Sequence, residues 1–482
     1  MKKLIMLSLL FYPFWALAQT ANDPPVMFKK RVLETTEVDI LTSYYTQDGQ
    51  NAAVTGGIGT EQLSDFASYI NISIPLNIDD VLTIDATVSA YTSASSSNLN
   101  PWSGDSDGDD DEREDSYINN GPTTGTPWVA SSGASRKDTW INTNIGYSHS
   151  SNDRNSIYST NVSFANEYDY TSFGGGIGIV RLFNQKNTEL SLNATLFKDS
   201  WRPQYPTEIK TYFNANGNLN ADFFQGVDIL DQNGIIINKA GPNAWKPTSS
   251  SLINNKGRNT YVLSFGFSQI VSKTTQIAVI VDPTYQKGWL ANPMQRVYFA
   301  DKDNFYIGNA SSIPFYTDPK NKDVFQLADD IERLPNSRFK VPIGVRFNQF
   351  LHENFVIRTY YRYYFDDWGI QSHTADAELA IKLGQKFTIN PNYRFYTQTA
   401  ADYFAPFDEL LSTDKYYTSD YDLSTFNANQ FGLGLMYTDI FTKKHIWKFG
   451  LKNLTLDYNY YKRSTGLRAH IVSLGAKFSL DR

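Results

Sequence analysis

Three groups of residues in this 482-residue sequence have types and spacings that could bind a ligand or perform chemistry. The first lies in the stretch SGDSDGDDDERED at 103–115, where Asp105, Asp107, Asp109 and Asp111 recur at every second position. Hard cations such as Ca²⁺ take six to eight oxygen ligands, which closely spaced aspartates on a loop can supply. The spacing differs from that of an EF-hand, so a solvated acidic loop and an acidic docking surface stay open beside a calcium site. Calcium is the one cofactor that the sequence suggests.

The second group is a glycine cluster within QDGQNAAVTGGIGTEQLSDF at 47–66. A phosphate-binding loop needs Gly-x4-Gly-Lys-Ser/Thr, and a dinucleotide-binding turn needs Gly-x-Gly-x-x-Gly. Neither spacing is present, so a nucleotide site is not expected here. Glycine permits a positive φ, and we therefore expect this loop to fold inward or pack tightly as an ordered cap. The residues of interest in it are Asp48, Gly49, Gly56, Gly57, Gly59 and Glu61.

The third group consists of charged residues that share one face of four successive period-two segments near the C-terminus. They are Arg338, Lys340, Arg346, Arg358, Arg362, Asp376, Glu378, Lys382 and Arg394. Unpaired charges are costly to bury, so these side chains must face water or pair across strands. Either they form a basic stripe that selects anions in a pore, or they form cross-strand ion pairs that brace a filled barrel. The acidic residues in segment 371–384 favour the ion pairs.

Histidine, the commonest general base, gives no catalytic signature in this sequence. The five histidines, His149, His352, His373, His445 and His470, show neither a Ser-His-Asp spacing nor a His-x-Glu spacing. We therefore expect a non-enzymatic protein. A hydrolase with a site built from loops remains an alternative, because catalytic triads assemble in space rather than in sequence.

The N-terminus predicts export from the cytoplasm. Lys2 and Lys3 precede an apolar run from Leu4 to Trp15, and Ala16-Leu17-Ala18 resembles a cleavage site, so residues 1–18 are interpreted as a signal peptide. The chain has no cysteine, which excludes a lipoprotein, and no later run of about 20 apolar residues that could form a membrane helix. The formal net charge is −7, so no nucleic-acid partner is expected.

The dominant pattern in the chain is alternation of apolar and polar residues, which is typical of strands with one face in a polar environment. In the last such segment Val472, Leu474 and Ala476 alternate with Ser473, Gly475 and Lys477. We predict strands at 32–45, 65–77, 81–93, 138–150, 156–169, 173–184, 188–200, 259–271, 276–286, 338–350, 355–367, 371–384, 386–399, 428–440, 447–462 and 467–480. The sequence thus predicts about 16 strands, within a range of roughly 14 to 18.

Short and long connections alternate between these segments, with long ones at 46–64, 94–137, 201–258, 287–337 and 400–427. Short periplasmic turns and long extracellular loops are typical of outer-membrane barrels, as is an aromatic content as high as the 15% found here. We therefore predict an all-β protein: a transmembrane antiparallel up-and-down β-barrel in the outer membrane of a Gram-negative bacterium. The barrel domain would span 32–482, after a short periplasmic segment at 19–31.

Three motifs in the first third of the chain resemble an uncharacterised domain-of-unknown-function family of predicted outer-membrane barrels that is common in Bacteroidetes. They are Tyr44-Tyr45 with the glycine loop that follows, YTSASSS at 91–97 and SSGASRKDTW at 131–140. The resemblance implies an outer-membrane location and no established activity.

Loops 201–258 and 287–337 carry many aromatic residues, whereas disordered segments are poor in them. We expect these loops to fold, either closing the lumen or forming a docking surface. The sequence therefore favours a structural or accessory protein that contacts outer-membrane lipid and presents its loops to other outer-membrane or surface proteins. A porin-like channel for small solutes is the alternative, because a barrel of this size leaves an aqueous lumen unless loops fill it.

Overall fold

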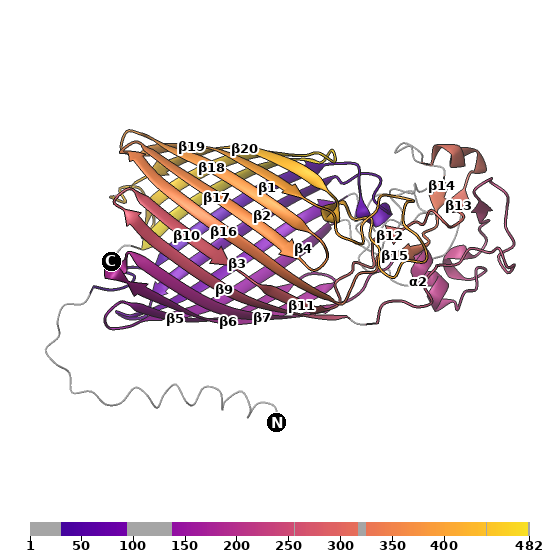
Figure 1. Ribbon diagram of the computed structural model, residues 1–482, viewed down its shortest axis with the longest axis horizontal. Helices are drawn as coiled ribbons and strands as arrows, with labels where there is room; N and C mark the ends of the chain where they lie inside the picture. Colours follow the sequence, from indigo (N-terminus) through magenta and orange to yellow (C-terminus); the bar gives the residue numbers. More distant parts are fainter. Residues whose placement is uncertain (1–29, 94–136, 255, 317–323, 440, 481–482) are drawn as a thin grey trace, which may run out of the picture.

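The computed structural model describes residues 30–254 except 94–136, and residues 256–480 except 317–323 and 440. It is a closed, antiparallel, all-β barrel of 16 strands (Figure 1), which confirms the predicted fold. The strands are β1 (Glu37–Asp48), β2 (Leu63–Pro75), β3 (Asp80–Ser93), β4 (Lys137–Ser150), β5 (Ser156–Asn166), β6 (Tyr170–Phe183), β7 (Thr188–Trp201), β9 (Gly257–Ser272), β10 (Thr275–Val281) with β11 (Thr284–Gly288), β16 (Ser337–His352), β17 (Phe355–Asp366), β18 (Gln371–Leu383), β19 (Phe387–Gln398), β20 (Phe426–Thr438), β22 (Phe449–Arg463) and β23 (Arg468–Leu480). The signal peptide predicted at 1–18 lies outside the described residues.

Pairing of the first strand with the last closes the barrel. Strand β1 pairs with β2 on one side and with β23 on the other, so that Glu37 lies opposite both Ser73 and Ser479. Closure leaves no strand edge with unpaired backbone groups, which a membrane-spanning sheet requires. No helix in the described part of the chain is both long and apolar enough to cross a membrane.

The alternation seen in the sequence separates an apolar exterior from a polar lumen. On β6 the outward residues Phe173 and Ile177 are 61% and 69% exposed, although both are apolar. Gly174 and Gly176, which alternate with them, face inward next to short polar side chains. On this lumen face Asn144 of β4 accepts a hydrogen bond from Asn161 of β5. An apolar outer surface with a polar interior is the arrangement that a lipid bilayer favours.

One predicted strand is interrupted. The segment expected as a continuous strand at 276–286 forms β10 and β11, which are separated by Asp282 and Pro283. Proline cannot donate a backbone hydrogen bond, so Pro283 leaves a gap in the ladder here, although β16 and β19 continue through Pro342 and Pro391. The ladder continues around the break, because Pro283 O accepts from the backbone N–H of Leu263 on β9. Since β9 and β16 each pair with both pieces, β10 and β11 count as a single pass through the wall.

The two ends of the barrel differ greatly (Figure 1). Strand β1 begins and β23 finishes at one end, here called the terminal end, where most described turns are short, such as 353–354 between β16 and β17. At the opposite end, the loop end, the described residues of 49–62, 202–256, 289–336 and 399–425 fold together into a body that we call the cap. The cap contains α2 (Thr207–Asn214) and the short strands β8 (Leu230–Asp231), β12 (Arg296–Val297), β13 (Phe305–Gly308), β14 (Val324–Gln326) and β15 (Asp330–Ile331).

The cap has a hydrophobic core of its own. Its largest cluster of buried side chains is formed by Tyr205, Ile209, Leu219, Phe223, Phe224, Val227, Ile229, Trp245, Tyr298, Ile307, Phe325, Leu327, Ala328 and Ile331. These residues come from two loops, and Phe223 packs edge-on against Phe325 with ring centroids 6.0 Å apart. Burial of so many aromatic and aliphatic side chains explains why the loops are folded. Among the described aromatic residues of loops 201–258 and 287–337, only Phe315 is exposed, at 64%.

Candidate functional site

A buried ion pair ties three loops of the cap together. Arg296 of β12 donates from Nε to Glu208 Oε1 at 2.7 Å and from Nη2 to Glu208 Oε2 at 3.1 Å. Its Nη1 donates to the backbone carbonyl of Val54 at 3.0 Å. The side chains of Arg296 and Glu208 are 1% and 0% exposed, so water does not screen the pair. Glu208 lies in the first turn of α2, and Val54 lies in the glycine loop.

The glycine loop packs against the cap through its positive-φ residues. Gly56 and Gly57 have φ values of 84° and 90°, and Gly59 has a φ of 92°. A Cβ atom on Gly56 would lie 2.6 Å from Tyr298 Cδ2, and one on Gly57 would lie 2.7 Å from the backbone oxygen of Ser419. Only glycine therefore fits both the backbone conformation and the space at these positions.

The other residues singled out in this loop lie at its base. Asp48, the last residue of β1, is exposed, whereas Gly49 is buried against the carboxyl group of Glu61. Glu61 Oε2 accepts the backbone N–H of Asn51 at 3.0 Å, and burial raises the pKa of Glu61 above its usual range. The loop thus brings a carboxyl group to the inner side of the loop end.

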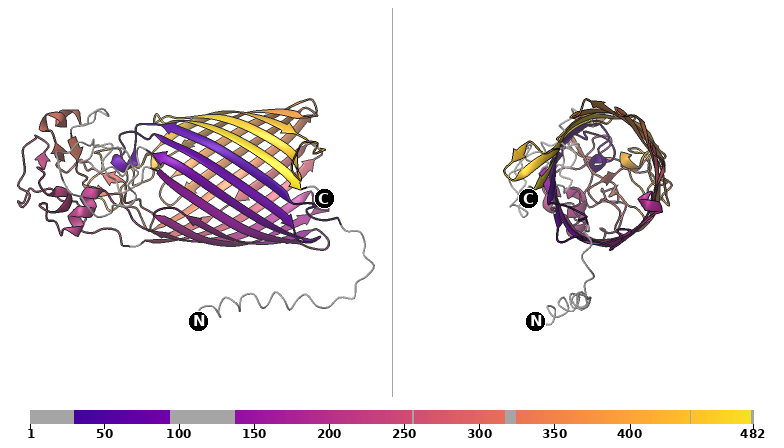
Figure 2. Two further views of the ribbon diagram at one scale, coloured as in Figure 1. Left: turned by 180° about the vertical axis from the view of Figure 1, so that it is seen from behind. Right: turned by 90° about the vertical axis from the view of Figure 1, so that its left-hand side faces the viewer.

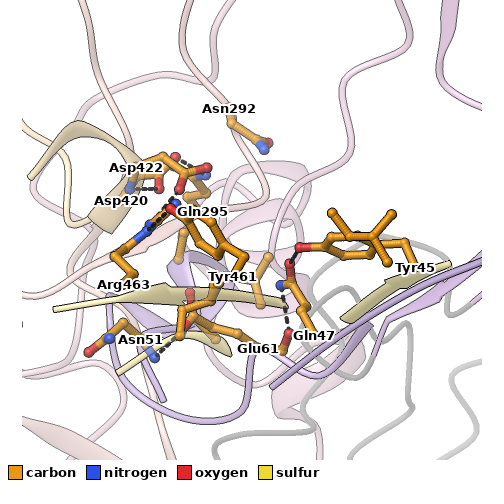
Figure 3. A pocket seen from close by; sticks show the side chains of 15 residues that line it. Tyr45, Gln47, Asn51, Glu61, Asn292, Gln295, Asp420, Asp422, Tyr461 and Arg463 are labelled. Carbon is orange, nitrogen blue, oxygen red and sulfur yellow. Dashed lines mark hydrogen bonds and ion pairs between the residues drawn. The ribbon is translucent and has the colours of Figure 1, made fainter. Parts of the chain in front are cut away.

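A polar pocket of about 500 Å³ lies between the cap and the barrel wall (Figure 3). The wall contributes Tyr45 and Gln47 from β1, Tyr461 and Arg463 from β22 and Ile471 from β23. The cap contributes Asn51, Ala52, Ala53, Val54, Glu61, Asn292, Gln295, Asp420 and Asp422, and Leu467 completes the lining. A volume of this size can accommodate a small molecule.

Carboxyl groups dominate the chemistry of the pocket. Arg463 pairs with Asp422 at 2.8 Å, while Asp420 accepts from Gln295 Nε2 at 3.2 Å and from the backbone of Asp422 at 2.9 Å. Burial, followed by the nearby charge of Asp422, raises the pKa of Asp420 to about 6. Behind the lining, burial and the charge of Asp420 raise the pKa of Glu332 to about 8.

Sequence reasoning missed this pocket. Asp420, Gln295 and Arg463 come from three distant segments with no shared motif, and neither Asp420 nor Gln295 lies in an alternating strand. The only signal in the sequence was indirect, since the loops that supply them are long and rich in aromatic residues.

The predicted lumen charges divide into paired and unpaired groups. Arg358 pairs with Glu378, and Arg394 pairs with Asp376 at 3.1 Å, in both cases across neighbouring strands. Arg338 pairs with Asp366 and lies over the ring of Trp368. The remaining contacts are weaker: the Arg346 guanidinium lies 5.5 Å from the Tyr360 ring centroid, and Arg362 donates to Thr374 at 3.5 Å. Lys340 and Lys382 have no ion pair among the described residues.

The opposite wall of the lumen carries negative charge. In a ring of 16 strands, β16–β19 lie across from β2–β5. Asp65 of β2 and Asp85 of β3 face inward, where Asp65 accepts from Ser89 at 2.6 Å and Asp85 accepts from Asn144 at 2.9 Å. Neither carboxylate has an ion-pair partner among the described residues. Cross-strand ion pairs thus exist on the wall formed by β16–β19, and this wall faces an acidic one.

Exposure of the inward side chains shows where the lumen is filled. The side chains of Arg358 and Arg394 are 52% and 49% exposed, so water reaches them. At the loop end, inward-facing Ala428 and Ala469 are 1% and 0% exposed, so water does not reach the wall at these positions. A view from the terminal end shows cap segments crossing behind the open ring of strands (Figure 2).

Three histidines lie on the outward face of the barrel, away from the pocket. His149 contacts Asp80 at 2.6 Å, His373 contacts the hydroxyl of Tyr361 at 2.7 Å, and His470 contacts that of Tyr458 at 2.9 Å. The aspartates of the predicted calcium site, Asp105, Asp107, Asp109 and Asp111, lie outside the described residues, so that site stays a prediction.

A closed barrel with an apolar exterior, a polar lumen and a folded cap defines an outer-membrane β-barrel protein. The chain belongs to DUF3570, a family described as proteins of unknown function, whose model matches residues 17–472. This confirms the resemblance to an uncharacterised family.

Among solved structures, the chain is similar to a deltaS2S3 mutant of the monoaromatic hydrocarbon channel TodX, with 8% identity, a TM-score of 0.39, and coverage of 94% of this chain and 91% of that one. A bacterial polysaccharide outer membrane secretin has 8% identity and a TM-score of 0.38, with coverage of 92% and 98%. The Pseudomonas putida toluene transporter TodX has 7% identity and a TM-score of 0.36, with coverage of 94% and 90%. Similarities this low carry no argument about function. No curated protein matches the chain.

Proposed function

We propose that this protein is a non-enzymatic, integral outer-membrane barrel that presents its cap at the cell surface to another outer-membrane or surface protein. The terminal end faces the periplasm and the cap faces outward, because short turns and long loops are distributed in this way in outer-membrane barrels. The observation that carries the proposal is the buried pair between Arg296 and Glu208, which fixes three loops as one body.

A passive pore does not require a buried ion pair that joins its loops. Desolvation of two charged side chains costs several kcal/mol per ion, and the pair is maintained only where geometry and additional hydrogen bonds offset that cost. Here the third hydrogen bond, from Arg296 to Val54, joins the glycine loop to the body of the cap. A rigid cap of this size provides a preorganised surface for a partner, since little loop entropy is lost when it binds.

Photo-crosslinking from two positions tests the display of the cap. Phe315 on the cap is 64% exposed, and Trp447 in the turn between β20 and β22 at the terminal end is 94% exposed. A photoreactive amino acid at position 315 in intact cells is expected to give one discrete protein adduct, while the same residue at position 447 gives no adduct of that mass. Absence of any adduct from position 315 contradicts the proposal.

A channel is the second candidate, and the charged, water-exposed lumen favours it. Arg358 and Arg394 lie in the part of the lumen that water reaches. The cap would then have to move to open the bore. Conductance across a planar bilayer separates the two candidates, because we expect no steady open steps from the intact protein, and steady steps of porin size would favour the channel.

A further inference from the structure

The pocket beneath the cap has the chemistry of a binding site for a small organic cation. We propose that it binds a small molecule that carries a protonated amine. The inference goes beyond the display of the cap, since binding to the isolated protein requires no partner.

The lining is net anionic. Three carboxyl groups, those of Glu61, Asp420 and Asp422, face a single guanidinium, that of Arg463. Arg463 is already paired with Asp422, so Glu61 and Asp420 have no cationic partner among the described residues. The pKa of Asp420, about 6, leaves this group mostly ionised at neutral pH. A cation in the pocket would therefore compensate charges that the protein leaves uncompensated.

The hydrogen-bonding groups point to the same kind of ligand. Gln295, which is 9% exposed, lines the pocket, and its buried Oε1 has no hydrogen-bond partner. Its Nε2 donates a hydrogen bond to Asp420, and Nε2 of Gln47 donates one to the backbone oxygen of Glu61 at 2.8 Å. Nδ2 of Asn51 donates to the backbone oxygen of Thr465 at 3.0 Å. Each of these three amide nitrogens therefore makes a hydrogen bond within the protein, whereas Oε1 of Gln295 receives none, and a ligand that carries N–H donors could satisfy it.

Two aromatic rings complete the arrangement (Figure 3). Tyr45 and Tyr461 are part of the lining, from β1 and β22 respectively. Aromatic rings combined with carboxylates are a common way to bind organic ammonium groups, because the ring face attracts the cation. A bare metal ion is less suited to the site, since the three carboxyl groups do not converge closely enough to hold one, and no other such group is found among the described residues.

The acidic wall of the lumen provides an approach to the pocket. Asp65 lies opposite Tyr45 in the register of β2 and β1, and Asp85 lies further along the same wall towards the terminal end. Both carboxylates lack an ion-pair partner among the described residues. A lumen wall of one sign raises the local concentration of the opposite charge. A cation that enters the exposed part of the lumen would therefore be drawn along β2 and β3 towards the pocket.

The test is calorimetric titration of the full-length protein in detergent with three probes of matched length: 1,4-diaminobutane, butane-1,4-diol and succinate. At pH 7.5 and constant ionic strength, we expect saturable binding of the diamine, binding of the diol that is weaker by about tenfold or more, and no binding of succinate. Equal affinity for diol and diamine would overturn the proposal, as would tighter binding of succinate.

Substitutions in the lining test whether the diamine binds in this pocket. Asp420→Asn and Glu61→Gln preserve side-chain shape and are each expected to weaken diamine binding about 10- to 100-fold, the range for a hydrogen bond to a charged group. Glu353→Gln makes the same chemical change in an exposed turn at the terminal end and should leave the affinity unchanged. Retention of the heat-dependent shift in gel mobility shows that each variant is folded. Unchanged affinity in a folded Asp420→Asn protein would refute the site, whatever the outcome of the crosslinking experiment.

Discussion

Arg296 and Glu208 lie 88 residues apart in the chain and form an ion pair with two hydrogen bonds inside the cap, where neither side chain is more than 1% exposed. The pair connects β12 with the first turn of α2, and Arg296 also reaches the glycine loop through Val54. Three loops at the loop end are therefore joined by contacts in which no strand of the barrel wall takes part.

Removal of one partner should loosen the cap without unfolding the barrel. Arg296→Met leaves the Glu208 carboxylate buried without compensation, which typically costs about 3–5 kcal/mol. We expect rapid proteolysis of the cap, while the barrel keeps its heat-dependent gel shift. The double variant Arg296→Met/Glu208→Leu removes both charges and should regain much of the resistance to protease. Equal sensitivity of the single and double variants would contradict this account.

The packing of the glycine loop can be tested with two matched glycine substitutions, one in this loop and one in a turn at the terminal end. Gly57→Ala combines a strained positive φ with a Cβ atom 2.7 Å from the backbone oxygen of Ser419. Gly384→Ala, at φ 68° in a turn at the terminal end, has the strain alone, because no atom lies within 4 Å of its Cβ. The left-handed conformation costs a non-glycine residue about 1–2 kcal/mol, so the melting temperature should fall further for Gly57→Ala than for Gly384→Ala. Similar melting temperatures would show that the loop can move aside.

The cap should become less stable as pH rises. Burial raises the pKa of Asp329 to about 7 and that of Glu332 to about 8, far above the values of exposed carboxyl groups. The folded cap therefore binds more protons than the unfolded chain between the ordinary and the raised pKa values. The resulting stability is fully present below the ordinary pKa values, 3.8 for Asp329 and 4.5 for Glu332, and is lost as pH rises towards about 8.

Proteolysis of the cap at a series of pH values measures this effect. Sensitivity should increase from acid to neutral pH, once the intrinsic pH dependence of the protease has been corrected with an unfolded substrate. Glu332→Gln, which cannot ionise, should flatten the dependence. A profile that is flat for the unmodified protein would show that neither carboxyl group controls the cap.

Single cysteines can map the closure of the lumen, because the natural chain contains none. Arg394→Cys occupies a position whose side chain is 49% exposed, whereas Ala428→Cys lies near the loop end of β20 at a position that is 1% exposed. A small maleimide should label position 394 at least tenfold faster than position 428, since thiol reactivity requires access. Comparable rates at both positions would mean that the loop end is open.

Much of the fold was predictable from local patterns. Strand β4 was expected at 138–150 and is found at Lys137–Ser150, and β17 was expected at 355–367 and ends at Asp366. Alternation predicts these strands well because each strand has lipid on one face and a polar lumen on the other. The polarity of a side chain therefore indicates the face on which it lies. The split of β10 from β11 was not predicted, and Pro283 alone does not indicate it, because Pro342 and Pro391 lie within the continuous strands β16 and β19.

The sequence by itself determined the barrel, its approximate strand number and the presence of ordered loops, because these depend on periodicity and composition within short windows. Only the tertiary structure decided how the loops meet, and hence the Arg296–Glu208 pair, the closure of the loop end and the pocket. Asp420 and Gln295 meet because their loops pack around the buried cluster of Val297, Phe299, Leu410 and Tyr417, and Arg463 joins them from the barrel wall. Such contacts depend on the packing of whole side chains over long sequence separations, and no local pattern encodes them.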